Sequence, residues 1–461
     1  MTMIGSKTAI ITIISRQMDL RLNISNRQIL GLALPISMAM VIPQINFITN
    51  NIFLGRLGER ELGTAGITGV YYLVVAVIGN GLNNGLQSII SRRAGENNIA
   101  AIGRTYTQGL RLSFVFALAA IVLTYLITPY MMRYFLHSED VAKEAVSFLY
   151  IRVWGLPFLF CYQMSNAFLV GTNHSRFLVY GTLCETIVNV FLDYSLINGH
   201  FGLPALGFNG AAYASIAAEC TGMCVILGCI GAKGLHRRFF IFRQLRLDRG
   251  LTLLIFRRSM PLVLQYSLSL MAWLYFYTLI EHHGTLGLAV SNTLRNIVGL
   301  FGVFSWAFAS TTNTMVSNVI GQGLQEQVGP LIRRITALSL GFCLVIALVL
   351  NVFPLAFLGI YGQDAHFVRV AVPLLRMVTG SLCLMAVANV WLNAVTGTGR
   401  TRVNLAIELV AIVAYIIYVY LVLERFNLGL VWAWGSEYLY WIILGVLAFI
   451  YIRSGKWKYH R

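Results

Sequence analysis

The sequence is short of charge, and above all of acidic residues. Charged residues make up 11% of the 461 positions, and only 17 of these residues are Asp or Glu, against 34 Lys or Arg. The longest polar segment runs from about Lys233 to Arg258, so no stretch of domain length is polar. Because soluble domains carry about 25% charged residues, this shortage excludes a chain of soluble domains.

Cysteine is scarce as well. All seven cysteines fall in apolar segments, and an odd number buried there gives no disulfide framework. We interpret them as small core residues. The sequence also contains no Gly-rich loop of the ATPase type, which argues against ATP-driven transport. We expect no cofactor.

Apolar residues dominate the chain instead. Hydrophobic residues make up 57% of it, and the mean hydropathy is +0.73. A helix needs about 20 apolar residues to cross a bilayer, and runs of this kind occur six times in each half. The sequence therefore predicts an all-α polytopic membrane protein with twelve transmembrane helices in two six-helix bundles. The runs begin near residues 30, 65, 111, 145, 177 and 206, and near residues 260, 286, 334, 369, 402 and 429.

The two halves of the chain are copies of one unit. Residues 35 to 95 are matched by residues 261 to 321 at a constant offset of 226 positions. Because each half has an even number of helices, we expect parallel repeats related by an axis along the membrane normal. We predict a bundle over 1–232, a basic cytoplasmic linker over 233–258 and a second bundle over 259–461. The matching pairs are Pro35 and Pro261, Gly58 and Gly284, Leu62 and Leu288, Ser91 and Ser317, Gly95 and Gly321, and Gly171 and Gly397.

Basic residues gather at the helix ends on one side of the predicted membrane. This bias is typical of the cytoplasmic side, so we expect both termini and the linker in the cytoplasm. The expected location is the cell membrane, in a bacterium the inner membrane. Acidic headgroups of the lipid bilayer are the expected partners of this charge, nucleic acid is not, and we expect a monomer. Outside the linker, the residues are Lys7, Arg16, Arg21, Arg27, Arg92, Arg93, Arg104, Arg111, Arg400, Arg402, Arg453, Lys456, Lys458 and Arg461.

Ionisable residues inside a membrane are costly and usually functional. Five acidic residues lie well inside predicted helices. The fifth helix is the richest, because Glu185, Asn189 and Asp193 are spaced four apart and form one polar stripe. The five acids are Glu185, Asp193, Glu219, Glu408 and Glu437.

Two interpretations of this stripe remain open. Its side chains can join helices through buried hydrogen bonds, which are common in membrane bundles. Alternatively, carboxylate and amide oxygens at this spacing can coordinate Na⁺ or share a proton, which predicts an ion-coupling site. Asn46 and Asn50 in the first helix, and Asn80 and Asn84 in the second, have the same spacing and supply further oxygens.

Two segments resemble a known transporter family. LALPISMAMVIPQINFITNNIFLGRLGERELGTAGI is similar to the first helix and following turn of the multidrug and toxic compound extrusion (MATE) family. GTNHSRFLVYGTLCETIVNVFLDYSLI is similar to that family's fourth loop and fifth helix. The resemblance extends over nearly the whole chain. It implies an antiporter that exports small organic, often cationic, compounds in exchange for H⁺ or Na⁺.

The resemblance also implies which residues couple to the ion. In one branch of the family the fifth helix carries an Asn and an Asp four apart, and these positions match Asn189 and Asp193. That branch has an Asp in the first helix, fifteen residues after a proline, where this chain has Asn50. Because this change removes one negative charge, Glu185 is our candidate for the missing acid. We lean towards H⁺ as the coupling ion and keep Na⁺ open.

The C-terminal half has a different polar set. At the offset of 226, Tyr415 and Val419 replace the Asn and Asp of the fifth helix, so we assign coupling to the N-terminal bundle. Arg295, Glu408 and Glu437 are candidates for the cavity or for gating. Arg295 can snorkel to the outer headgroups or form a buried ion pair with Glu437.

Proline in the first helix is a further candidate for gating. Pro35 and Pro43 each weaken the backbone hydrogen bonding there, so the helix can bend or hold a fixed kink. The alternative function is a flippase for lipid-linked saccharides or another polar lipid. That function needs several basic residues in the cavity, and few are present. A membrane enzyme is disfavoured because the acids are scattered in depth.

Overall fold

The computed structural model describes residues 19–55, 59–136, 138–243, 246–282, 284–359 and 365–458. Every regular element in these ranges is a helix or helical turn. Twelve helical segments of the described chain are long and apolar enough to cross a membrane. The prediction of an all-α polytopic protein is therefore confirmed. Lys7, Arg16, Gly58 and Arg461 of the sequence analysis lie outside the described residues.

The N-terminal lobe contains the first six spanning segments. The fourth of them, α5 with α6, is interrupted by a 3₁₀ turn over Val153–Gly155. The elements are α2 (Asn26–Gly55), α3 (Glu59–Gly95), α4 (Ile99–Phe135), α5 (Glu139–Arg152), α6 (Leu156–Gly171), α7 (Arg176–Asn198) and α8 (Phe208–Ala232).

The C-terminal lobe contains the other six. The short helix α9 (Leu235–Arg238) connects the two lobes. The lobe continues with α10 (Arg249–Glu281), α11 (Thr285–Gly321), α12 (Val328–Val352), the short α13 (Pro354–Gly359), α14 (Ala365–Gly397), α15 (Thr401–Tyr420) and α16 (Leu430–Arg453). A 3₁₀ turn (Gln325–Gln327) precedes α12, and a π-helical turn (Leu421–Arg425) ends α15.

Several helices begin earlier than hydropathy predicts. α4 begins at Ile99 and α10 at Arg249, about ten residues before the predicted starts. Side-chain caps explain both positions, since Asn98 Oδ1 accepts from the Ala101 amide at 3.2 Å and Asp248 Oδ1 accepts from the Leu251 amide at 2.9 Å. These first turns are too polar for a hydropathy signal. As a result, α9 and the beginning of α10 lie in the segment predicted as linker.

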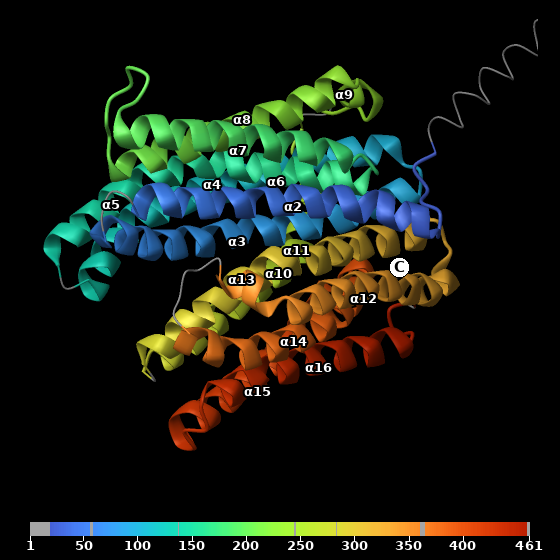
Figure 1. Ribbon diagram of the computed structural model, residues 1–461. Helices are drawn as coiled ribbons and strands as arrows, with labels where there is room; N and C mark the ends of the chain where they lie inside the picture. The colour runs from blue at the N-terminus through green and yellow to red at the C-terminus, as the bar shows by residue number, and fades with distance from the viewer. Residues whose placement is uncertain are drawn as a thin grey trace, which may run out of the picture.

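The two lobes lie side by side, and their helices converge at one end and diverge towards the other (Figure 1). The seam between them is made by α3 packed on α10 and α11, and by α2 packed on α11. We call the end that holds Gly95 and Gly321 the closed end. These two glycines are partners in the sequence repeat.

At the closed end the backbones of α3 and α11 touch directly. A Cβ added to Gly95 would lie 2.0 Å from the carbonyl oxygen of Asn318, and one added to Gly321 would lie 2.1 Å from that of Arg92. Arg92 and Asn318 are also repeat partners, so the crossing obeys the pseudo-twofold symmetry that the parallel repeat predicts. Only glycine permits so close an approach.

The first turns of α2 and α10 pack into the opposite lobe. Ile29 of α2 belongs to the hydrophobic core of the C-terminal lobe. Its repeat partner Ile255 of α10 belongs to the core of the N-terminal lobe. The segment before α2 straddles both, because Leu20 is buried in the N-terminal core and Leu22 in the C-terminal core.

Hydrogen bonds hold this segment, residues 19–25, across the seam. The Asn318 side chain accepts from the Leu22 amide and donates to the Leu20 carbonyl, both at 3.0 Å. Arg334 donates to the Ile24 carbonyl at 2.9 Å. Its repeat partner Gln108 donates to the carbonyl of Arg246 in the linker at 2.8 Å. Each lobe therefore holds the backbone segment that leads into the first helix of the other.

Gly95→Ala tests the closed end. The added methyl group must push α11 away, so we expect the free energy of unfolding to fall by about 1–3 kcal/mol. Gly69→Ala on the same helix is the matched control, because a Cβ there meets no atom within 4 Å. It should be neutral, or stabilising by up to about 1 kcal/mol. Thermal unfolding in detergent measures both; equal stabilities would contradict the close crossing.

Candidate functional site

The polar stripe of α7 faces the interior of the N-terminal lobe. α7 starts after the turn that follows Gly171 and ends at Gly199, whose φ of 77° closes the helix. Asn189 is 1% exposed and Asp193 is 0% exposed, whereas Glu185 is half-buried. The helix packs against α2 on one side and α8 on another. Asn189 and Asp193 are therefore enclosed by protein.

α2 and α7 together bury five oxygen atoms that receive no hydrogen bond from any described residue. They are both carboxylate oxygens of Asp193 and the side-chain carbonyl oxygens of Asn189, Asn46 and Asn50. All five are acceptors. A buried acceptor without a donor is unfavourable by about 1–3 kcal/mol, and a carboxylate by more. All five lie on residues that the sequence analysis named as candidates for ion coupling or for the cavity.

Glu185 points from the same helix towards α8. A Cβ added to Gly222 of α8 would lie 2.8 Å from Glu185 Oε2, so the carboxylate rests on a glycine. Gly222 is three residues from Glu219, which places both acids along the same stretch of α8. Glu185 is thus in contact with α8.

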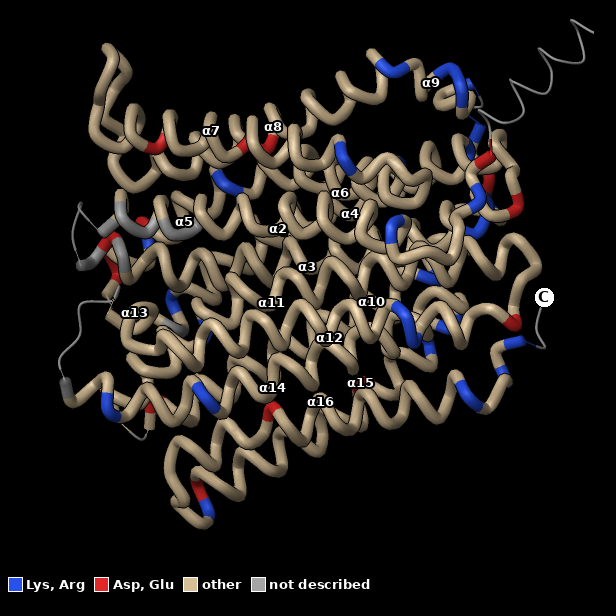
Figure 2. The backbone as a smooth tube through the Cα atoms, turned by 45° about the vertical axis from the view of Figure 1, so that its right-hand side comes forward, with Lys and Arg blue, Asp and Glu red and all other residues tan. Residues whose placement is uncertain are grey.

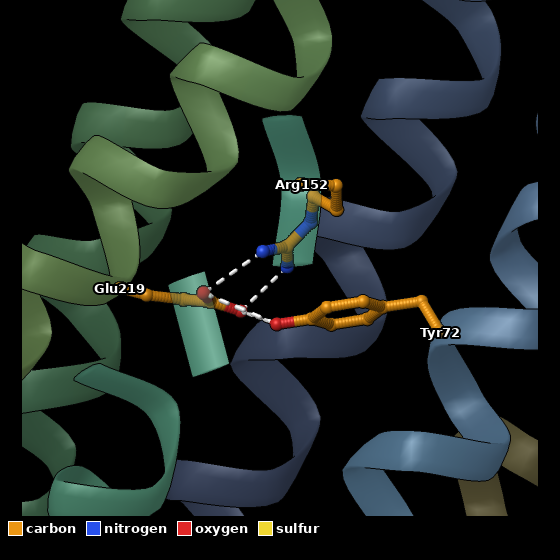
Figure 3. Close-up of polar contacts among 3 residues, drawn as sticks. All are labelled: Tyr72, Arg152 and Glu219. Atoms are coloured by element: carbon orange, nitrogen blue, oxygen red, sulfur yellow. Dashed lines mark hydrogen bonds and ion pairs between the residues drawn. The ribbon is translucent and has the colours of Figure 1, made fainter. Parts of the chain in front are cut away.

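Glu219 is held in a buried ion pair that the sequence analysis missed (Figure 3). Arg152 donates to it twice, from Nη1 to Oε2 at 2.9 Å and from Nη2 to Oε1 at 2.5 Å. The hydroxyl of Tyr72 donates to Oε1 at 2.9 Å, and the guanidinium carbon of Arg152 lies 3.7 Å from the centre of the Tyr72 ring. Both side chains of the pair are almost buried, with 11% and 7% exposed.

The break between α5 and α6 makes room for this pair. Arg152 ends α5, and Gly155 closes the 3₁₀ turn that follows. A Cβ at Gly155 would lie 2.2 Å from Glu219 Oε2 and 2.5 Å from Arg152 Nη1. The sequence analysis placed Glu219 inside a predicted helix but gave no reason to pair it with Arg152. No spacing joins them, because they are 67 positions apart.

The acids of the C-terminal lobe already have donors. Glu408, 1% exposed, accepts from Gln265 at 3.1 Å, from Ser269 at 2.5 Å and from the Tyr440 hydroxyl. Glu437 accepts from the indole of Trp441 at 3.0 Å. The Glu408 carboxylate therefore joins α10, α15 and α16, whereas the bond of Glu437 stays within α16.

Arg295 lies beside aromatic rings. Its guanidinium carbon is 5.5 Å from the ring centre of Trp273 and 5.6 Å from that of Tyr277, both on α10. Among the described residues no ion pair joins it to Glu437. The arginine is half-buried, and the ring faces stabilise its charge.

The other candidates take part in helix packing. Asn80 accepts from Gln163 of α6 at 3.1 Å. The side chain of Asn84 donates to the backbone carbonyl of Asn80 at 3.1 Å. The backbone carbonyl of Asn84 accepts from the side chain of Asn313 across the seam. The side-chain oxygens of Asn80 and Asn84 are not among the five unpaired oxygens. Pro35 and Pro43 both lie inside α2, which continues through them from Asn26 to Gly55.

Comparisons with known proteins agree with this architecture. The MatE family model matches the chain twice, over residues 35–195 and 261–421, which reproduces the repeat. A probable multidrug resistance protein NorM of Thermotoga maritima is 22% identical over 94% of this chain and 93% of its own length. The multidrug resistance protein NorM of Burkholderia vietnamiensis is 24% identical over 81% of each chain.

Solved structures share the fold. A MOP superfamily transporter from Pyrococcus furiosus superposes with a TM-score of 0.86 at 18% identity, over 95% of this chain and 97% of the other. An outward-facing multidrug resistance MATE family transporter also superposes with a TM-score of 0.86. It is 17% identical, and the match covers 95% of this chain and 98% of the other. The two family matches cover most of the sequence and both lobes of the fold. The chain is therefore a multi-pass membrane transporter, not an enzyme, and belongs to the MATE family of multidrug efflux proteins.

Proposed function

We propose that the protein is an antiporter that exports small organic, cationic or amphipathic compounds in exchange for H⁺, with Na⁺ as the alternative ion. The observation that carries this proposal is the contrast between the lobes. The acids of the C-terminal lobe have donors from side chains, whereas the carboxylate of Asp193 is buried without one. The substrate class rests on the multidrug resistance names of the relatives.

The residues of α2 and α7 fit either ion. A proton needs one buried carboxylate, and Asp193 supplies it. Na⁺ needs a shell of oxygens, and Asn189, Asn46 and Asn50 would add to both carboxylate oxygens. Asn50 is neutral, so the set carries a single negative charge, which favours H⁺. Glu185 lies two turns along α7 and adds a second acid to the lobe.

We place the closed end in the cytoplasm. Figure 2 shows many Lys and Arg residues at the end that carries α9, and this excess is typical of cytoplasmic loops. The transporter then stands with its lobes joined on the cytoplasmic side. Exchange requires the opposite arrangement as well, with the lobes joined on the outer side. The lipid bilayer is the expected environment of a monomer in the bacterial inner membrane.

The alternative function, a flippase for lipid-linked saccharides, has less support. It needs several free basic residues in the membrane-spanning part of the cavity, where they would hold a pyrophosphate. Arg152 is neutralised by Glu219, and Arg295 lies over two aromatic rings. Neither arginine is a spare cation inside the membrane.

Asp193→Asn tests the coupling site. The variant should insert and fold but lose export driven by a pH gradient in Na⁺-free proteoliposomes, because the amide neither ionises nor binds a proton at neutral pH. Asp140→Asn, which removes an exposed carboxylate of the same lobe, should leave export unchanged. Export of a fluorescent organic cation is the measurement. Gradient-driven export at the wild-type rate in Asp193→Asn would contradict the assignment of Asp193. If export by the wild-type protein strictly requires Na⁺, the coupling ion is Na⁺ and not H⁺.

Glu185 and Asn50 provide a second test. If Glu185 replaces the acid absent at Asn50, Glu185→Gln should slow export, and adding Asn50→Asp should restore part of it. The physical reason is charge, since the double variant returns one carboxylate to the α2–α7 side. Initial export rates of the single and double variants decide the question. If the export rate of Glu185→Gln equals that of the wild type, Glu185 only packs against Gly222 and takes no part in coupling.

The Arg152–Glu219 pair supports the lobe and takes no part in proton transfer. Arg152→Met should lower the free energy of unfolding by about 3–5 kcal/mol, because Glu219 is left buried and unpaired. Adding Glu219→Leu removes that charge and should recover most of the loss. Thermal unfolding of the two variants measures this. A double variant as unstable as the single one would show that the unpaired carboxylate is not the cause.

A further inference from the structure

A pocket of about 240 Å³ lies at the closed end, between the lobes. The N-terminal lobe contributes Arg92 and Arg93 near the end of α3, and the C-terminal lobe contributes Arg258 of α10 and the turn that holds Gly399. The candidate coupling site on α2 and α7 contributes no residue to this pocket. The proposed antiport therefore gives the pocket no role.

Arg258 is built into the pocket wall. Its Nη1 donates to the carbonyl oxygen of Gly399. Gly399 has a φ of +84°, and a Cβ there would lie 1.5 Å from the same nitrogen, so only glycine leaves room for the guanidinium. No other hydrogen bond or ion pair of Arg258 involves a described residue. Its remaining N–H groups are therefore available to a ligand.

The other side of the pocket adds positive charge. Arg93 also lines it, and the Nε of Arg93 is buried without a hydrogen-bond partner among the described residues. Arg92 Nε lies 3.9 Å from Glu96, whose side chain is 44% exposed. An exposed pair at this distance is weak. Glu96 is the single carboxylate on the wall, so the guanidinium groups outnumber the acids that face them.

The neighbouring acid, Asp248, is already used as a cap. It lies in a second pocket of about 310 Å³, which shares Arg93 and Leu254 with the first. Its carboxylate accepts from the Leu251 amide at 2.9 Å and begins α10. Like charges gathered at this seam attract an anion, and planar guanidinium groups are suited to the oxygens of a phosphate.

The rim of the pocket is apolar on one side. Leu254 lines it and is 37% exposed. Leu253 and Phe256, on the same turns of α10, are 45% and 40% exposed. The pocket lies at the ends of spanning helices, where lipid headgroups are found. An acyl chain can follow α10 while its headgroup enters the pocket.

We propose that this pocket binds an anionic phosphate group, carried by a membrane lipid or by a soluble phosphate. The ligand would bridge Arg92 and Arg93 of one lobe to Arg258 of the other. Because these residues belong to different lobes, the site is complete only while the closed end is closed. Binding then stabilises this arrangement of the transporter.

The test compares three arginines in the full-length protein. Arg258→Gln and Arg92→Gln each remove one side of the pocket and should weaken binding about tenfold. Arg257→Gln is the matched control. Arg257 carries the same charge, is the neighbour of Arg258 in the sequence and has an exposed side chain, so its loss should change binding less than twofold. Phosphatidylglycerol binding is counted by native mass spectrometry against phosphatidylcholine. Binding of radiolabelled inorganic phosphate is measured in phosphatidylcholine nanodiscs.

Each outcome is decisive. Loss of phosphatidylglycerol binding in the two pocket variants identifies a lipid, and loss of phosphate binding in the same variants identifies a soluble ligand. If neither probe depends on Arg258 and Arg92, or if Arg257→Gln weakens binding equally, the site is wrong. Should Arg258→Gln fail to fold, Arg92→Gln decides alone, because the only ion pair of Arg92 with a described residue is the weak one with Glu96. No transport is measured, so the result stands apart from the proposed antiport.

Discussion

The contact between the α3 and α11 backbones is the constraint on which the rest of the structure depends. Gly95 and Gly321 allow each helix to touch a carbonyl oxygen of the other, and the repeat supplies both glycines at once. With the lobes joined there, the first turns of α2 and α10 fill the opposite cores. The helices are then free to diverge only at the other end. In this conformation, one pair of glycines thus permits the contact that closes one end of the transporter.

The two lobes share a fold, but one buried acid of the N-terminal lobe, Asp193, has an environment unlike that of the other buried acids. Glu408 accepts three hydrogen bonds from neutral donors, and Glu219 is neutralised by Arg152. Asp193 has no donor among the described residues. At the repeat offset its partner is Val419, which is fully buried in an apolar core. Duplication supplied the scaffold, and substitution at a few positions made the two bundles chemically different.

Local features of the structure could be predicted from the sequence. The twelve spans follow from apolar runs, the repeat from self-similarity, and the inward stripe of α7 from a spacing of four. Three contacts could not be predicted. They are the ion pair of Arg152 with Glu219, the hydrogen bond from Arg258 to the Gly399 carbonyl, and the hydrogen bonds of the Asn318 side chain. Each joins segments far apart in the chain, so only the packing of helices brings them together. The capped starts of α4 and α10 were missed because their polar first turns carry no hydropathy signal.

α2 is the element that links the candidate coupling site to the seam. Its first turns, with Ile29 and Leu32, lie in the core of the C-terminal lobe. Its later turns carry Asn46 and Asn50, whose side-chain oxygens are buried without a hydrogen-bond partner among the described residues. Pro35 and Pro43 lie between these two regions, where the missing backbone hydrogen bonds make bending less costly. α2 therefore carries candidate coupling oxygens in its later turns and packs its first turns into the opposite lobe, with both prolines between the two regions.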